Sequence, residues 1–152
     1  MTGLRSSLQH VWVPGVARNG GRLPLATRMR LVVEILVTYP GLLRVVRTND
    51  LEAMVALARR PTKPPVRLTA AEARETSKRL GFIVSRVLAL MPADRRCLIR
   101  SLVLVRLLSR RGIDGRLVIG ASADQGFAAH AWVEYEGKQV LPSGGHAKLV
   151  EF

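Results

Sequence analysis

The chain of 152 residues is long enough to bury one hydrophobic core, and 48% of its residues are hydrophobic. A single cysteine excludes an internal disulfide framework, and no apolar run suits a signal peptide or a membrane span, so we expect a cytoplasmic protein. The net charge of +13 favours an anionic partner, but the aromatic content of 5% and the lack of helix-turn-helix or zinc-finger spacing disfavour nucleic-acid binding as the main function.

The N-terminal part of the chain predicts an extension followed by helices. Proline and glycine pairs punctuate residues 1–23, which we expect to form a flexible extension. Apolar residues at helical spacing predict a helix over residues 25–47, which Pro40 should break or kink. Asp50, or Asn49 before it, can cap a further short helix.

A proline-rich segment, residues 61–65, separates this part from the rest of the chain. Because such a segment cannot form regular structure, we interpret it as a linker. We therefore assign residues 24–65 to an N-terminal helical segment with its linker, and residues 66–152 to the main domain.

The main domain begins with two predicted helices. Thr69 and Glu72 have the spacing of a capping box, which starts a helix that reaches about Leu90. Asp94 can cap the next helix, and Gly112 can end it in the left-handed conformation.

From Arg116 onward the apolar residues repeat at every second position, as they do in strands. We expect three strands, over residues 116–121, 128–135 and 138–141, the last of which returns through a turn at Glu136-Gly137. Helices followed by antiparallel strands predict an α+β fold.

Cys97 lies in the first turn of the second of these helices. The free backbone N–H groups and the helix dipole favour a thiolate there, and Arg95 and Arg96 add positive charge. Ser101 follows one turn later on the same face and is small enough to let a sheet approach just below the thiol. A lone cysteine on an apolar helix is, however, also typical of a simple core residue.

His130 falls on the strand predicted over residues 128–135. The alternation places it on one face with Trp132 and Glu134, between small residues that leave room for another group to reach its ring. A purely structural histidine would fit the same position. A cysteine at a helix N-terminus followed by a histidine on a strand is nevertheless the arrangement that Cys–His nucleophilic catalysis needs, and the spacing alone does not decide whether the two side chains meet.

Several runs of the sequence resemble the transglutaminase-like leader peptidases of lasso-peptide biosynthesis. They are Cys97-Leu98-Ile99-Arg100-Ser101-Leu102, Leu107-Leu108-Ser109-Arg110-Arg111-Gly112-Ile113, Leu117-Val118-Ile119-Gly120 and Ala129-His130-Ala131-Trp132-Val133-Glu134. The basic helical segment before them also resembles the N-terminal part of that family. The resemblance implies a papain/transglutaminase-like core of helices packed on a small antiparallel sheet, with Cys97 as the nucleophile and His130 as the general base.

The same resemblance implies a reaction and partners. The enzyme would hydrolyse one peptide bond to remove the leader segment of a ribosomal precursor peptide. A separate small leader-recognition protein would present the precursor, and a separate ATP-dependent cyclase would then close the macrolactam. We expect no cofactor and no metal, since one cysteine and three scattered histidines do not have the spacing of metal ligands.

The family's third catalytic residue, an acidic residue about twelve positions after the histidine, has no counterpart in this chain. Pro142 and Ser143 occupy the corresponding place. Glu134 is four strand residues from His130, about 13 Å along the strand, which is too far to orient the ring. Ser143, a backbone carbonyl or a water molecule would therefore have to hold His130.

Other residues have two interpretations each. Trp132, Arg96 and Arg100 are candidates for the wall of a substrate groove. Trp132 could equally be a core residue. Arginines crowd the helix that carries Arg96 and Arg100, and they could form either a solvated stripe or a path for an acidic leader. His146, in a glycine-containing loop, is expected to be solvated.

Two other functions stay open. A transglutaminase-type enzyme would use the same Cys–His pair but deliver the acyl group to an amine instead of water. A catalytically weakened binding module would account for the missing acidic residue.

Overall fold

The computed structural model describes residues 23–48, 50–60, 68–91, 96–122, 128–143 and 145–152. Almost all of the expected N-terminal extension, the proline-rich linker and the Asp94 cap fall outside these residues.

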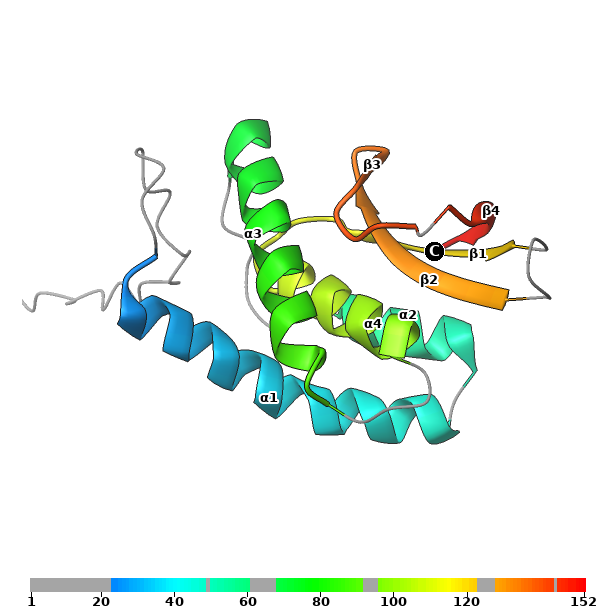
Figure 1. The fold of residues 1–152 in the computed structure, drawn as a ribbon, viewed down its shortest axis with the longest axis horizontal. Coiled ribbons are helices and arrows are strands. Elements are labelled where there is room, and N and C mark those ends of the chain that lie inside the picture. The colour runs from blue at the N-terminus through cyan, green and yellow to red at the C-terminus, as the bar shows by residue number, and fades with distance from the viewer. Residues whose placement is uncertain (1–22, 49, 61–67, 92–95, 123–127, 144) are drawn as a thin grey trace, which may run out of the picture.

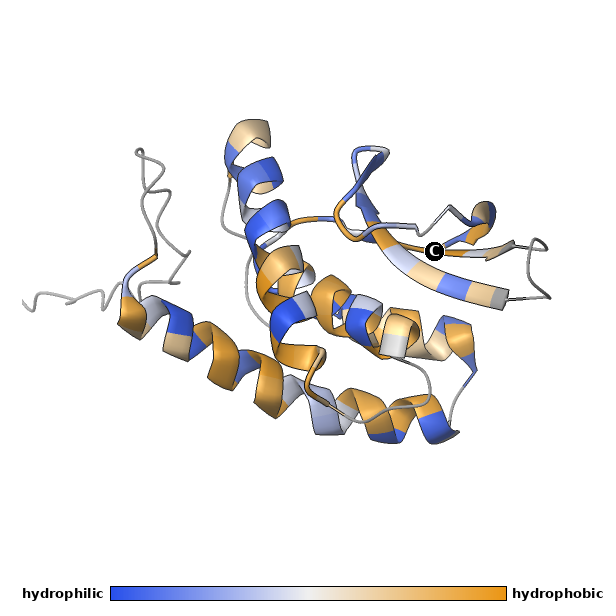
Figure 2. Ribbon diagram, in the orientation of Figure 1, coloured by the Kyte–Doolittle hydropathy of each residue, from blue (hydrophilic) through white to orange (hydrophobic). Residues whose placement is uncertain are grey.

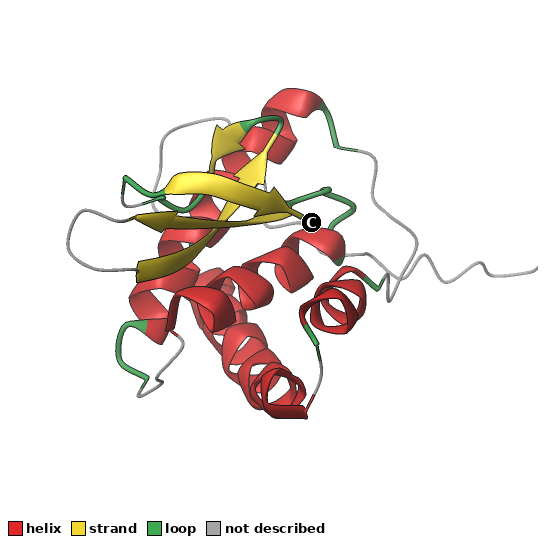
Figure 3. Ribbon diagram, turned by 90° about the vertical axis from the view of Figure 1, so that its right-hand side faces the viewer, coloured by secondary structure: helices red, strands yellow, loops and turns green. Residues whose placement is uncertain are grey.

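Four helices and a four-stranded antiparallel sheet make up the described chain, which confirms the α+β prediction. The helices lie against one side of the sheet (Figures 1 and 3). The elements are α1 (Leu25–Thr48), α2 (Leu51–Arg59), α3 (Ala70–Leu88), α4 (Arg96–Ser109), β1 (Arg116–Ser122), β2 (Ala128–Tyr135), β3 (Lys138–Gln139) and β4 (Ala147–Glu151). None of the helices described combines the length and the apolar character needed to cross a lipid bilayer.

Helix α4 is the centre of the fold. Between Leu102 and Leu108 every residue except Arg106 is apolar, a pattern typical of a helix that other elements enclose on all sides. It contacts α1, α2 and α3 as well as β1 and β2, and its apolar side chains from Leu102 to Leu108 are fully buried. The hydrophobic core therefore anchors the helix that carries Cys97 at its N-terminal end.

The local capping signals are confirmed. Asp50 accepts a hydrogen bond from the backbone N–H of Ala53 at 2.7 Å, and Thr69 and Glu72 form both bonds of a capping box. Gly112, after α4, has a φ of 70°. These residues satisfy backbone groups that a helix end leaves without partners, so they determine where α2 and α3 begin.

Helix α1 runs without interruption through Pro40, so of the two expected effects, a break or a kink, the break does not occur. A proline inside a helix costs about 3 kcal/mol. Side chains on both sides of it, including Leu31, Ile35 and Leu42, are buried in the same core, and each such burial contributes about 1.5–3 kcal/mol. Tertiary packing therefore outweighs the local penalty.

The strands are arranged in the order β3-β2-β1-β4, with Gly120 of β1 directly opposite His130 of β2. Strand β4 was not predicted. It is exposed and pairs with β1, and next to it Leu117 and Phe152 exchange backbone hydrogen bonds of 3.0 and 2.8 Å. All five of its residues are exposed, so long-range pairing determines this strand more than burial of its own side chains.

The turn from β2 to β3 pairs Tyr135 with Lys138, as predicted. Its two residues, Glu136 and Gly137, have φ values of 50° and 69°, which suit a tight hairpin. Strand β3 is shorter than expected and ends at Gln139, because the amides of Val140 and Leu141 both donate to the Val133 carbonyl, at 2.8 and 3.2 Å. Beyond that point the chain leaves the ladder, and the edge of β2 that carries His130 is left without a neighbouring strand on that side.

Candidate active site

Cys97 lies in the first turn of α4, half-buried and packed against the core. The side chain of Arg96, as well as Asp94 and Arg95, lies outside the described part of the chain. One turn after Cys97, Ser101 is completely buried, as its small size predicts.

A hydrogen bond from Ser101 ties the thiol-bearing helix to β2. In an antiparallel ladder, residues two apart direct their backbone groups to the same side, so the carbonyls of Val133 and Ala131 both point toward the β3 edge. Strand β3 has ended before it reaches Ala131. The Ser101 hydroxyl instead donates to the Ala131 carbonyl at 3.1 Å. The second turn of α4 therefore lies at the open edge of β2, bonded to the residue that follows His130. Helices and sheet contact each other mainly through α4 and β2 (Figure 1).

The His130 ring is half-buried and is held on two sides. Its Nε2 lies 3.2 Å from the Pro142 carbonyl oxygen. The His146 ring stacks on it with 4.9 Å between the ring centroids. His146 is half-buried and its Nδ1 is 2.8 Å from the Ser143 carbonyl, so the prediction that it would be solvated was wrong. Nothing in the spacing of the sequence indicated this stack.

The contact with Pro142 determines which nitrogen of His130 can act as a base. A carbonyl oxygen only accepts hydrogen bonds, so the proton of a neutral imidazole lies on Nε2 in this geometry. Nδ1 then carries the lone pair. The described residues give Nδ1 no hydrogen-bond partner, which leaves it available to a thiol.

Ser143 does not use its hydroxyl on His130. The Ser143 hydroxyl accepts a hydrogen bond from the Gln139 side chain at 3.0 Å, and its carbonyl receives the bond from His146. Of the groups considered for holding His130, the structure shows a backbone carbonyl, that of Pro142.

Trp132 is a core residue and does not form an exposed groove wall, because only 2% of it is exposed. Its ring stacks on His130 at a centroid distance of 6.3 Å, and its Nε1 donates to Glu134 at 2.9 Å. Glu134, itself buried, also accepts a bond from Lys148 at 2.8 Å. This bond is the main cause of a raised pKa at Lys148, with a smaller effect of its bond to Glu151. Glu134 thus supports the ring next to His130 without touching His130.

Most of the arginines described on and just after α4 bind other helices. The Arg106 guanidinium donates to backbone carbonyls at the end of α2, and Arg110 and Arg111 donate to Glu34 of α1. Arg110 and Arg111 are thus paired with a carboxylate and Arg106 is bonded to main-chain oxygens, so these three side chains do not form a freely solvated stripe. Arg100 is half-buried.

The structure brings together the two elements that carry the predicted pair, α4 and β2. Among the described residues, no hydrogen bond joins the Cys97 thiol to the His130 ring. The same residues contain no group of three or more potential ligands that could hold a metal ion. Cys97 and His130 as a catalytic pair therefore stay a prediction.

Comparison with known proteins gives one match. The family model described as the transglutaminase-like superfamily matches residues 35–152, which include α2, α3, α4, the whole sheet and most of α1. No protein of curated function and no solved structure was found to be similar to the chain.

Proposed function

The chain belongs to the transglutaminase-like superfamily, and on this premise we propose that it is a cysteine peptidase that removes the leader segment from a ribosomally made lasso-peptide precursor. Members of this superfamily commonly use a cysteine for catalysis. Cys97 is the only cysteine of the chain, so it alone can supply that chemistry. The observation that carries the proposal is the bond between Ser101 and Ala131, which fixes the turn after Cys97 to the residue after His130.

The first step of the proposed reaction forms a tetrahedral intermediate on Cys97. The Cys97 thiol gives its proton to Nδ1 of His130, and the sulfur attacks the carbonyl carbon of the scissile peptide bond. The backbone N–H of Cys97, at the N-terminal end of α4, would donate to the developing oxyanion. Hydrogen bonds between catalytic side chains commonly tighten only when the substrate is bound. The proposal is therefore compatible with the lack of a Cys97–His130 hydrogen bond among the described residues.

The second half of the reaction releases both products. The protonated His130 donates its proton to the leaving amine, which is the N-terminus of the freed core peptide. The C–N bond breaks, and the leader remains bound to Cys97 as a thioester. Water, deprotonated by the same imidazole, then hydrolyses the thioester and restores the Cys97 thiol. Throughout, the Pro142 carbonyl would keep Nε2 protonated and the ring oriented, a task that an acidic side chain performs in related triads.

The sequence resemblance supports the choice of substrate and partners. A precursor peptide would be delivered by a separate small leader-recognition protein, and its product would pass to an ATP-dependent macrolactam cyclase. We further propose that residues 66–152 form the catalytic domain and that residues 24–65 support it, with the protein acting in the cytoplasm.

The test is a cleavage reaction with synthetic precursor, recognition protein and this chain, followed by mass spectrometry. We expect free leader and core peptides. Cys97→Ala and His130→Ala should each lower the rate on the order of a thousandfold or more, while both variants keep the melting temperature. A Cys97→Ala protein that still released leader would disprove the proposal.

The same reaction separates the two alternatives. An acyl-transferring enzyme would give a covalent conjugate when a primary amine is added, where a peptidase gives only cut leader. A binding module would give neither product. In that case iodoacetamide would label Cys97 no faster in the natural protein than in His130→Ala.

A further inference from the structure

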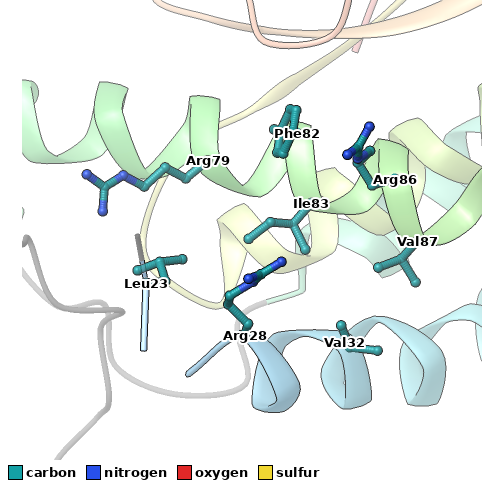
Figure 4. A pocket seen from close by; sticks show the side chains of 8 residues that line it. All are labelled: Leu23, Arg28, Val32, Arg79, Phe82, Ile83, Arg86 and Val87. Carbon is teal, nitrogen blue, oxygen red and sulfur yellow. The ribbon is translucent and has the colours of Figure 1, made fainter. Parts of the chain in front are cut away.

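A groove of about 370 Å³ lies between the N-terminal half of α1 and the C-terminal half of α3 (Figure 4). None of its lining residues belongs to α4 or to the sheet, so it is distinct from the candidate active site. The side chains that matter for its chemistry are Arg28, Val32, Arg79, Phe82, Ile83 and Arg86.

The groove combines an apolar floor with positive charge. Val32 of α1 points toward α3, and Ile83 and Val87 of α3 point toward α1 (Figure 4). Arg28 from α1 and Arg79 and Arg86 from α3 line the same groove. The Arg86 guanidinium lies 5.3 Å from the centroid of the Phe82 ring, a cation–π contact that positions both side chains at the rim.

Most of this positive charge is not neutralised within the fold. Arg79 pairs with Glu75 of its own helix at 2.7 Å. No ion pair with a carboxylate is found for Arg28 or Arg86 within the described ranges. Arg28 and Arg86 are exposed at the groove and have no acidic partner among the described residues.

Exposed apolar side chains continue from the groove along α1. Leu25, Met29 and Val33 are 72%, 54% and 55% exposed, and Phe82 across the groove is 64% exposed. Figure 2 shows hydrophobic residues along the length of α1. Contiguous exposed apolar surface bordered by charge is typical of a protein-binding site.

We propose that this groove binds an acidic peptide segment of another protein. Its apolar side chains would lie on Val32 and Ile83, and its carboxylates would pair with Arg28 and Arg86. Charge complementarity identifies the occupant. Residues 1–22 contain three arginines and no acidic residue, and a second copy of the chain carries a net charge of +13, so both are poorly matched to a cationic groove. The inference does not depend on the proposed peptidase activity.

The experiment measures fluorescence anisotropy of a labelled peptide of Glu and Leu residues, with the full-length protein, at low and at physiological salt. A second peptide, with Gln in place of every Glu, has the same length and apolar residues. We expect the acidic peptide to bind more tightly and the difference to shrink as salt rises.

Variants locate the binding. Arg28→Glu combined with Arg86→Glu should weaken the acidic peptide about tenfold or more, and Phe82→Ser should weaken both peptides. The matched control is Arg47→Glu combined with Lys138→Glu, which changes the net charge equally at exposed positions outside the groove. Equal melting temperatures show that each variant is folded.

Four results would overturn the proposal: no binding, equal binding of the two peptides, equal weakening by the control variant, or binding only to vesicles of anionic lipid. A photo-crosslinking phenylalanine analogue in place of Phe82 identifies the occupant directly. Crosslinks to the added peptide support the proposal, whereas crosslinks that form instead to residues 1–22 or to a second copy would overturn it.

Discussion

The Pro142 carbonyl oxygen lies 3.2 Å from Nε2 of His130, so a main-chain group contacts the imidazole on the side where a Ser-His-Asp triad has an acidic side chain. A main-chain acceptor cannot be removed by replacing a side chain, but its position depends on the rigidity of the segment that carries it. Proline has a fixed φ and so restricts that segment.

Replacing Pro142 by glycine should lower the cleavage rate several-fold, because the freed backbone no longer holds the carbonyl at Nε2. Ser143→Ala is the matched control and should change the rate by less than about twofold, since the Ser143 hydroxyl bonds to Gln139 and not to His130. Rates are compared at saturating precursor. If Ser143→Ala abolished activity while Pro142→Gly did not, the assignment of the carbonyl would be wrong.

Gly120→Ala should destabilise the protein by about 1–3 kcal/mol. A methyl group at this position would meet the Ala147 carbonyl and would lie 2.7 Å from the Trp132 ring, which stacks on His130. Urea denaturation measures the loss, and the rate of Cys97 alkylation reports whether the displaced Trp132 disturbs the site.

The comparison for this change is Gly41→Ala, in the middle of α1, where an added methyl group meets nothing within 4 Å. There the substitution should stabilise the protein by about 0.5–1 kcal/mol, because alanine has less freedom to lose in a helix. Opposite signs at the two glycines are expected; a neutral Gly120→Ala would contradict the close packing of β1 on Trp132.

Protonation of Glu34 should account for part of the loss of folding stability at acid pH. Burial acts to raise the pKa of Glu34, but hydrogen bonds and charge from Arg111 and Arg110 outweigh burial and hold this pKa below its usual 4.5. The resulting stabilisation is complete above the pKa of the unfolded chain and disappears as pH falls through the lower pKa of the folded state.

Glu34→Gln should therefore cost about 1–3 kcal/mol at neutral pH, because it leaves the buried Arg111 without its carboxylate. The difference in melting temperature from the natural protein should narrow as pH drops below 4.5. Glu75→Gln, which breaks an exposed pair with Arg79, serves as the control and should change stability little at any pH. A constant difference across the pH range would show that Glu34 acts through packing alone.

Ser101→Ala should cost about 1–3 kcal/mol, because the buried Ala131 carbonyl loses its partner at the open edge of β2. Ser77→Ala provides a contrast, since the Ser77 hydroxyl bonds only to Ala73 in its own helix. Denaturation midpoints compare the two variants. If both cost the same, the Ser101 bond would have no special role in joining α4 to β2.

Local signals in the sequence predicted much of this fold. The Asp50 cap, the capping box at Thr69, the left-handed Gly112 and the turn at Glu136-Gly137 all depend on neighbours a few residues away, so they can be recognised without a structure. Strand β4, the uninterrupted α1 and the early end of β3 depend on partners far along the chain, and local patterns do not reveal them.

The candidate site also combines features that local sequence patterns predict with features that depend on distant parts of the chain. Cys97 on a helix tip and His130 on a strand follow from periodicity. The spacing also placed Pro142 and Ser143 near His130, but it left open which of their groups holds the ring. The contact with the His146 ring depends on the path of a loop, which no spacing rule predicts.

Hydrogen bonds and ion pairs join α4, and the residues just after it, to α1 and α2. They limit how far the protein can be truncated from its N-terminal side. Ser109 donates to the Arg59 carbonyl, and Arg111 pairs with Glu34. A fragment that began at residue 66 would lack both anchors and would leave a long apolar flank of α4 in contact with water. We expect such a truncated chain to aggregate when expressed, so a minimal working version should retain the sequence from Leu25 onward.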